Sequence, residues 1–170
     1  MSSLKIELFF FSFYSKDHMK IPKILHQIWL SPNNSQEIPE PYKKYQLTCK
    51  KAHPSWKYII WNHSLVNSLI SKNYSKFLTL YNSYKYIVQK VDLAKLIIIY
   101  HYGGVYMDSD MECLKNLEDL LQDKSCVFSS LYGHCDEKSK FCPSALLMTA
   151  FKFYNQPIIS SGFYASVPNH

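Results

Sequence analysis

The segment Tyr102-Gly-Gly-Val-Tyr-Met-Asp-Ser-Asp110 carries the strongest structural signal in this sequence. Its two glycines are typical of the end of a helix, and Val-Tyr-Met predicts a short strand. Side chains two residues apart on an extended chain point to the same side, so Asp108 and Asp110 can share one divalent cation, directly or through water. Carboxylate oxygens suit Mg²⁺ or Mn²⁺, which accompany phosphate substrates. A solvated acidic turn is the simpler alternative, and the preceding Gly-Gly-x-Tyr argues against it.

The stretch before the glycines, from Tyr86 to Tyr102, is the clearest helix in the sequence. Its apolar residues are spaced for one buried face: Ile87, Val91, Ala94 and Ile98. Asp92 and Lys95 stand at positions i and i+3 and therefore share a face of this helix. From the residues alone, an ordinary surface ion pair is the favoured interpretation of these two side chains.

The rest of the chain alternates between short apolar runs and helix-like stretches. Strands are expected at 24–29, 56–61, 105–107, 126–131 and 145–149, and helices at 41–52, 116–121 and, as two short pieces, 65–84. Such alternation predicts an α/β sheet with helices on its faces. Open sheets of this class bind ligands beyond the carboxyl ends of their strands, which is where Asp108 is expected to lie.

Composition excludes several classes of protein. The chain has 170 residues, which fits one domain, and 47% of them are hydrophobic, which excludes a disordered or low-complexity protein. No apolar run approaches the roughly 20 residues that a transmembrane helix needs. All 19 basic residues are lysine, and the absence of arginine forks, together with the lack of a lysine–aromatic stripe, argues against a nucleic-acid-binding module.

The first eighteen residues are expected to be an N-terminal extension, with a single domain over residues 19–170. Met19 begins a start-like segment, and Lys5 and Glu7 interrupt the apolar run before it, so a signal peptide is only a weak alternative. We expect residues 1–18 to be dispensable for folding, and the protein to be cytoplasmic or peripheral to a membrane. The five cysteines form no C-x-x-C pair and are expected to be thiols.

Several segments, in order, resemble one enzyme family. They are Ile21-Pro-Lys-Ile-Leu-His-Gln-Ile-Trp29, Asp92-Leu-Ala-Lys-Leu96 and the segment ending at Asp110. Over roughly residues 20–170 the chain resembles glycosyltransferases with the DXD sugar-binding region (family 32), which include Och1-like and inositol-phosphoceramide mannosyltransferases. The resemblance implies a GT-A-like, Rossmann-like fold with a mixed sheet flanked by helices. It also implies a nucleotide-sugar donor, Mn²⁺ or Mg²⁺, and retention at the anomeric carbon.

The same resemblance assigns roles to individual residues. Asp108 and Asp110 match the metal-binding carboxylates, and Asp92 matches the residue that binds donor-sugar hydroxyls. Trp29 matches the aromatic residue that stacks on the base, and Gly104 matches a glycine of the donor site. Lys95 stands where the family usually has arginine, and it supplies a point charge in place of a bidentate fork. No residue is identified as a catalytic nucleophile.

The resulting expectation is a retaining, metal-dependent glycosyltransferase. It would move a hexose (mannose first, then glucose or galactose) to a glycan or glycolipid acceptor, with peripheral membrane contact and no nucleic-acid partner. Family members run beyond the segment 158–170, so we expect a fold that is incomplete at its C-terminus. A truncated, non-catalytic nucleotide-sugar-binding remnant is the alternative. A haloacid-dehalogenase-like phosphatase is rejected, because its Asp-x-Asp normally lies near the start of the domain.

Overall fold

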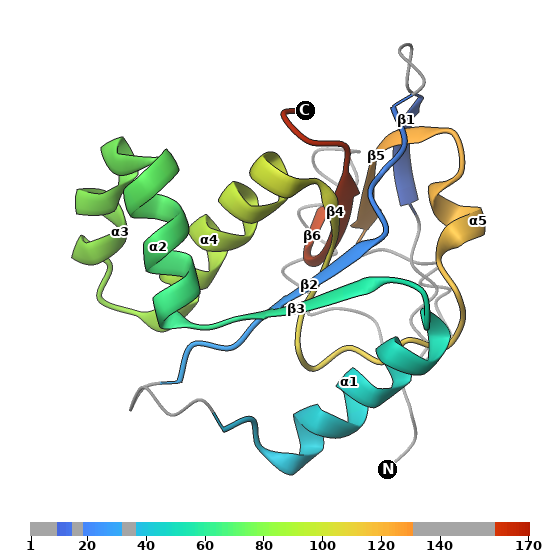
Figure 1. The fold of residues 1–170 in the computed structure, drawn as a ribbon, viewed down its shortest axis with the longest axis horizontal. Coiled ribbons are helices and arrows are strands. Elements are labelled where there is room, and N and C mark those ends of the chain that lie inside the picture. The colour runs from blue at the N-terminus through green and yellow to red at the C-terminus, as the bar shows by residue number, and fades with distance from the viewer. Residues whose placement is uncertain (1–9, 15–18, 32–36, 131–158) are drawn as a thin grey trace, which may run out of the picture.

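Six strands form one mixed sheet in the order β1-β5-β6-β4-β2-β3 (Figure 1). The structure is a computed structural model, and it describes residues 10–14, 19–31, 37–130 and 159–170. The strands are β1 (Phe10–Tyr14), β2 (Ile24–Ile28), β3 (Lys57–Trp61), β4 (Gly104–Met107), β5 (Lys124–Ser130) and β6 (Ile159–Ser166). The helices are α1 (Glu40–Ala52), α2 (His63–Asn73), the 3₁₀ turn η1 (Ser75–Phe77), α3 (Leu78–Ser83), α4 (Ile87–Tyr102) and α5 (Glu118–Leu121).

Parallel and antiparallel halves of the sheet meet at β4. Strand β2 pairs in parallel with both β3 and β4, with His26 opposite Tyr106. On its other side β4 pairs antiparallel with β6, which pairs antiparallel with β5. The expected α/β class, with a mixed sheet flanked by helices, is therefore confirmed. The carboxyl ends of β2, β3 and β4 lie at one edge of the sheet, where such folds bind ligands.

Helices cover both faces of the sheet, because successive strand residues point to opposite sides. Tyr106 and Tyr164 belong to a hydrophobic core with α2, α3 and α4. Val105 and Phe163, their neighbours in sequence, belong to a second core with α1 and α5. Figure 1 shows α2, α3 and α4 grouped together, away from α1 and α5. The buried face expected of α4 is also present, since Ala94 and Ile98 are both buried.

Two glycines allow α4 to turn directly into β4. Gly103 and Gly104 have φ angles of 62° and 91°, in the region that favours glycine. A Cβ atom on Gly104 would lie 2.6 Å from the carbonyl oxygen of Ile24, and one on Gly103 would lie 2.7 Å from Cδ of Pro168. The turn therefore has room only for glycines, and it brings α4 back against the strand that precedes Asp108.

A buried histidine joins this turn to the parallel strands. His26 is 0% exposed, its Nε2–H donates to the carbonyl oxygen of Gly103 (3.0 Å), and its Nδ1 accepts from the indole N–H of Trp61 (3.0 Å). Both ring nitrogens are occupied only when the imidazole is neutral. Burial lowers the pKa of His26 from 6.5 to about 4, against a smaller raising effect of the bond to Gly103.

Parts of the fold differ from the sequence-based expectation. Residues 10–14, which we placed in an extension outside the domain, form β1, and β1 pairs antiparallel with β5. Strand β6 was not expected, although it lies between β4 and β5 in the sheet. The strand expected at 145–149 lies outside the described residues. In the part of the chain that is described, no helix is both long and apolar enough to cross a membrane.

The edge strand gives a first prediction. A chain that begins at Met19 should lose about 1–3 kcal/mol of unfolding free energy, because the backbone of β5 exchanges its partner strand for water. Urea unfolding of the two chains measures the difference. An unchanged midpoint would restore the view that residues 1–18 are dispensable.

The histidine gives a second prediction. Unfolded His26 takes up a proton below about pH 6.5 and the folded form only below about pH 4, so acidification through this window favours the unfolded state. At pH 5 the unfolding free energy should be about 2 kcal/mol lower than at pH 7 through this residue. In His26→Gln the difference in unfolding free energy between pH 7 and pH 5 should be smaller by that amount. His63→Gln, the matched histidine control, should keep the wild-type difference. An identical pH dependence in His26→Gln and wild type would refute the assignment.

Candidate functional site

The candidate site lies at the carboxyl edge of the parallel strands. Strand β2 ends at Ile28 and β4 ends at Met107, and the two strands run side by side in the same direction. Trp29 and Asp108 are the first residues beyond these strands. The topology therefore brings them to the same edge of the sheet, although they are far apart in sequence.

The backbone of Asp108 is held from three directions. Its N–H donates to the carbonyl oxygen of Gly162 (2.8 Å), and its own carbonyl oxygen accepts from Nε2 of Gln27 (3.1 Å) and from the N–H of Met111 (3.1 Å). The side chain is held as well, because the hydroxyl of Tyr106 donates to Oδ1 of Asp108 (2.6 Å). These bonds fix one carboxylate in position at the sheet edge.

The bond from Met111 to Asp108 shows that the chain turns at once after β4. The expectation that residues 108–110 are extended is therefore wrong, and the argument that their carboxylates point to the same side of a strand fails with it. The strand ladder ends with Met107 opposite Phe163, and after the bond from Asp108 to Gly162 the chain leaves β6 in a turn. Asp108 is half-buried and Asp110 is exposed on the turn.

Four charged groups interact around this turn. Burial raises the pKa of Asp108, while the hydrogen bond from Tyr106 and the positive charge of Lys95 lower it, and the charges of Asp110 and Asp92 raise it. The residues that sequence reasoning selected on α4 and after β4 are thus close enough to influence one another.

Lys95 is the central charge of this group. Only 4% of the residue is exposed, and its ammonium lies 2.6 Å from Oδ1 of Asp92 and donates to the carbonyl oxygen of Ser161 (3.0 Å). The ammonium also lies 5.6 Å from the centroid of the Tyr106 ring, within cation–π range. The side chain of Asp92, in contrast, is 53% exposed. The favoured interpretation of a surface ion pair is therefore wrong for Lys95, which is buried.

Sequence reasoning missed the residues that support Asp108. Tyr106 precedes it by two positions, and burial raises the pKa of the phenol, so the hydroxyl stays protonated as a donor. Gln27 is 0% exposed, and its Oε1 accepts a hydrogen bond from the hydroxyl of Tyr58 while its amide holds Asp108. A polar residue within a buried strand needs such partners, and this was the available signal.

Gly162 supports the site through its lack of a side chain. A Cβ atom at this position would lie 3.0 Å from Oδ2 of Asp108, so a larger residue would press on the carboxylate and require it to shift. The residue lies in β6, a strand that the sequence analysis did not anticipate, and its contact with Asp108 depends wholly on sheet order.

The two remaining candidates differ in position. The Trp29 ring lies 4.9 Å from the ring of Tyr42 on α1, and its indole N–H is buried with no hydrogen-bond partner among the described residues. Gly104 stands at the start of β4, at the other end of the strand from Asp108. The structure does not bring Gly104 to the carboxylates, and it packs against the backbone of Ile24 instead.

The donor set around the turn suits a shared metal site. Among the residues that the structure describes, no three His, Cys, Asp or Glu side chains are grouped so that they could hold an ion alone. Asp108 and Asp110 offer carboxylate oxygens, whereas one carboxylate oxygen of Asp92 is paired with Lys95. Mg²⁺ and similar ions bind through one or two carboxylates and complete their shell with substrate phosphates and water. The residues therefore fit a cation that arrives with a phosphate-bearing ligand.

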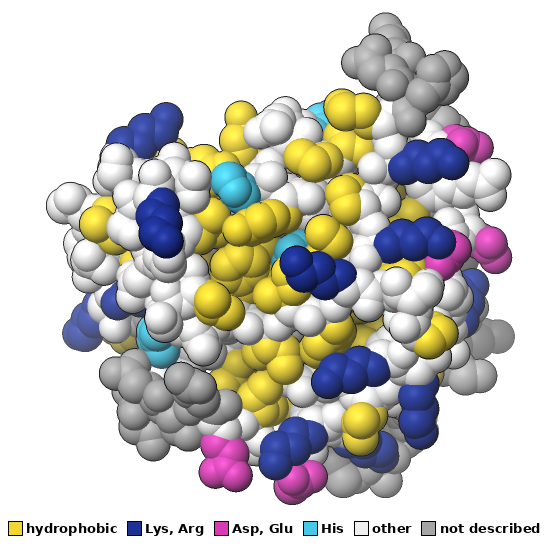
Figure 2. All heavy atoms as spheres, in the orientation of Figure 1, with side chains coloured by type: hydrophobic (Ala, Val, Ile, Leu, Met, Phe, Trp, Pro, Cys, Tyr) yellow, Lys and Arg dark blue, Asp and Glu magenta, His cyan; other side chains and the backbone are white. Residues whose placement is uncertain are grey.

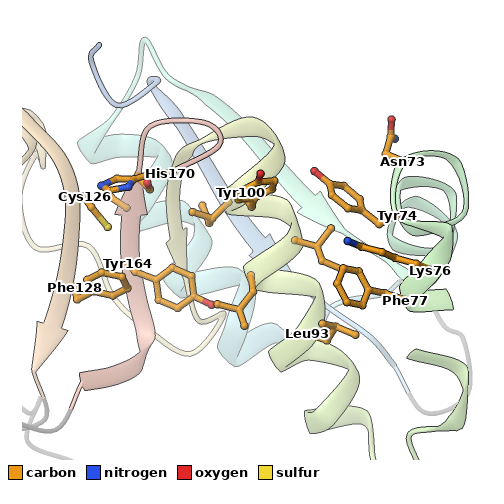
Figure 3. Close-up of a pocket in the computed structure, with 15 residues that line it drawn as sticks. Asn73, Tyr74, Lys76, Phe77, Leu93, Tyr100, Cys126, Phe128, Tyr164 and His170 are labelled. Carbon is orange, nitrogen blue, oxygen red and sulfur yellow. The ribbon is translucent and has the colours of Figure 1, made fainter. Parts of the chain in front are cut away.

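A hydrophobic cavity of about 670 Å³ is a separate feature of the fold (Figure 3). Its lining comes from η1, α4, β5 and β6, including Phe77, Leu93, Phe128 and Tyr164, and none of the carboxylates takes part. The hydroxyl of Tyr164 is buried without a hydrogen-bond partner among the described residues. On the face of the molecule seen in Figure 1, Figure 2 shows hydrophobic side chains forming a band with lysines around it.

Comparison with known proteins gives similar enzymes. The chain is 39% identical over 114 residues to inositol phosphoceramide mannosyltransferase 1 of Schizosaccharomyces pombe, covering 65% of this chain and 34% of that protein. It is 38% identical over 101 residues to mannosyl phosphorylinositol ceramide synthase SUR1 of Saccharomyces cerevisiae, covering 59% of this chain and 25% of that protein. The chain thus spans about a third or less of the length of these relatives.

The fold has a counterpart among solved structures. The PaToxG glycosyltransferase superposes with a TM-score of 0.55 at 14% sequence identity, over 88% of this chain and 56% of that one. The likeness confirms the GT-A-like fold expected from the sequence. The family profile described as "Glycosyltransferase sugar-binding region containing DXD motif" matches residues 39–127, which include Asp92, Asp108 and Asp110. This chain therefore belongs to the DXD-containing glycosyltransferase family that its sequence resembles.

Proposed function

We propose that the protein is a retaining, metal-dependent glycosyltransferase that binds a nucleotide sugar at the edge formed by β2 and β4. The observation that carries the proposal is the arrangement at the end of β4: a fixed, half-buried Asp108, an exposed Asp110, and a buried cation beside them. Family membership supports the reaction class, and retention is inferred from the family alone.

Asp108 and Asp110 are proposed to hold Mn²⁺ or Mg²⁺ together with the diphosphate of the donor. A bound divalent ion supplies charge stabilisation for the leaving diphosphate. Asp108 is suited to this role because Tyr106, Gln27 and Gly162 fix it before any ligand arrives, so little ordering is needed on binding. Asp110, on the turn, is accessible to the ligand.

Asp92 is proposed to bind hydroxyls of the donor sugar. One carboxylate oxygen faces Lys95, and the half-exposed side chain leaves the other available. An ammonium has three N–H donors, and in Lys95 two of them are taken by Asp92 and by the carbonyl oxygen of Ser161. Lys95 is therefore proposed to act as a positioning residue that orients Asp92, instead of as a direct phosphate ligand.

Trp29 is proposed to stack on the base of the nucleotide. Its place just beyond β2 and its half-buried ring support this role, because part of an aromatic surface is accessible at the edge of the sheet. Gly104 is assigned no ligand contact in this proposal.

Mannose is the proposed sugar and a glycolipid the proposed acceptor. Both choices rest on relatives named as inositol phosphoceramide mannosyltransferases. Glucose and galactose follow mannose as donor sugars. A non-catalytic protein that binds the nucleotide sugar without transferring it is the alternative, and a transfer assay with GDP-mannose and inositol phosphoceramide distinguishes the two.

Metal dependence is the first test of the proposal. Mn²⁺ should tighten the binding of GDP or UDP by at least about tenfold, because the cation reduces the repulsion between the two carboxylates and the diphosphate. Calorimetry with and without Mn²⁺ measures this. Asp108→Asn and Asp110→Asn should abolish the gain, while Asp119→Asn on the exposed surface of α5 should retain it. Equal affinity with and without metal would contradict the proposal.

The pair on α4 gives a second test. Asp92→Ala should weaken binding of the nucleotide sugar about tenfold while leaving the free nucleotide within about twofold, because Asp92 is assigned to the sugar alone. It should also cost about 1–3 kcal/mol of stability, since it leaves a buried ammonium without its counter-charge. Lys95→Arg should retain donor binding, and Lys72→Ala on the exposed surface of α2 is the control.

Calorimetry with GDP-mannose and GDP, or with UDP-glucose and UDP, compares these variants. If the affinity of Asp92→Ala for the nucleotide sugar equals that of wild type, the assignment of this residue is wrong. The metal site at Asp108 and Asp110 would then stand alone.

A further inference from the structure

Two buried cysteines from distant parts of the chain, Cys49 and Cys113, lie in contact with each other. Cys49 lies in α1 and is 0% exposed, and Cys113 lies just after the turn that carries Asp110 and is 8% exposed. Their sulfur atoms are 2.7 Å apart, and both are free thiols in this structure. A disulfide bond needs a sulfur separation of about 2.05 Å, so only a small movement divides the two states.

The backbones around these cysteines are tied together on both sides. The N–H of Cys113 donates to Oγ1 of Thr48 (3.0 Å). Nδ1 of His53 lies 3.0 Å from the carbonyl oxygen of Cys49, and Nε2 of the same ring accepts from the N–H of Leu117 (3.0 Å). The fold therefore keeps the two cysteines next to each other.

The two sulfurs have different environments. The hydrogen bond from Cys113 lowers the pKa of Cys49, while the same bond raises the pKa of Cys113. Cys49 is thus the sulfur that forms a thiolate more readily, and the thiolate is the reactive form. The third buried cysteine of the described residues, Cys126, is a free thiol in β5, and burial raises its pKa.

Cys49 is 0% exposed, so an oxidant must be small and must approach it through a neighbouring cavity. A cavity of about 290 Å³ reaches this residue between α1 and β3, with Lys50, Pro54 and Tyr58 in its wall. The ammonium of Lys50 lies 4.9 Å from the centroid of the Tyr58 ring, which places a positive charge in the same wall. A cavity of this size admits a peroxide but not a peptide-sized disulfide.

We propose that Cys49 and Cys113 form a reversible disulfide that fastens α1 to the segment following the Asp108–Asp110 turn. With hydrogen peroxide as oxidant, the Cys49 thiolate attacks one peroxide oxygen, the O–O bond breaks, and hydroxide leaves as Cys49 becomes a sulfenic acid. Cys113 then attacks the Cys49 sulfur, the S–S bond forms, and water leaves with the thiol proton. Overall, two thiols and one peroxide give one disulfide and two waters. The proposal is independent of the sugar or acceptor.

Peptide mapping of the full chain tests the proposal. Fully reduced protein is treated with one equivalent of hydrogen peroxide, the excess is removed, and the chain is unfolded in the presence of N-ethylmaleimide and digested. The state of all five cysteines is followed by mass spectrometry. The expected product is a cross-linked peptide pair containing Cys49 and Cys113, lighter by two hydrogen atoms than the reduced pair. Cys126→Ser should still form it, whereas Cys113→Ser should stop at the sulfenic acid of Cys49.

A stability measurement supplies a second readout on the wild-type chain. The bond closes a long loop, so oxidation should raise Tm by roughly 5–10 °C, and a reductant should reverse the rise. This comparison needs no variant, so a poorly folding Cys113→Ser would not weaken the test. Recovery of Cys49 and Cys113 as separate maleimide adducts, or as over-oxidised acids without a cross-link, would overturn the proposal. So would a cross-link that joins either residue to another cysteine.

Discussion

A buried positive charge organises the candidate site. The ammonium of Lys95 is removed from water, and such a group is stable only if nearby anions and dipoles replace the lost hydration. Asp92, the carbonyl oxygen of Ser161 and the ring of Tyr106 supply that replacement from α4, β6 and β4. The need to stabilise this one charge thus holds α4, β6 and β4 in place relative to one another. Tyr106 in turn positions Asp108, because its hydroxyl donates a hydrogen bond to that carboxylate.

The sheet order makes this arrangement reachable. Gly103 and Gly104 return α4 against β4 within two residues, and β6 then pairs with β4 from a distant part of the chain. Gly162 leaves space beside the carboxylate of Asp108, which a Cβ atom would approach to 3.0 Å. A donor with a negatively charged diphosphate would meet two carboxylates, and the fold resolves this repulsion only if a divalent cation binds with it. The proposed metal dependence therefore has a physical reason in this arrangement of charges as well as in the family.

Local patterns predicted those parts of the structure that local physics determines. The 3.6-residue spacing of apolar residues identified α4, and the two glycines identified its end. The carboxylates after β4 supplied the candidate site, which stays a prediction. The burial of Lys95 was not predictable, because an i, i+3 pair looks the same on an exposed and on a buried face. Strand β6 reads Ile-Ser-Ser-Gly-Phe-Tyr-Ala-Ser, without a regular alternation of polar and apolar residues, and its place beside β4 follows from pairing over a long sequence separation. The turn after Asp108 was missed because it depends on where that pairing ends.

The central claim is that Asp108 and Asp110 hold a divalent cation together with a nucleotide sugar. Anomalous diffraction from crystals grown with Mn²⁺ and GDP-mannose tests it most directly. The account predicts a manganese peak within about 2.2 Å of a carboxylate oxygen of Asp108 or Asp110, in contact with diphosphate oxygens, and the sugar beside Asp92. A nucleotide bound elsewhere, or bound at this edge with manganese away from both carboxylates, would contradict it.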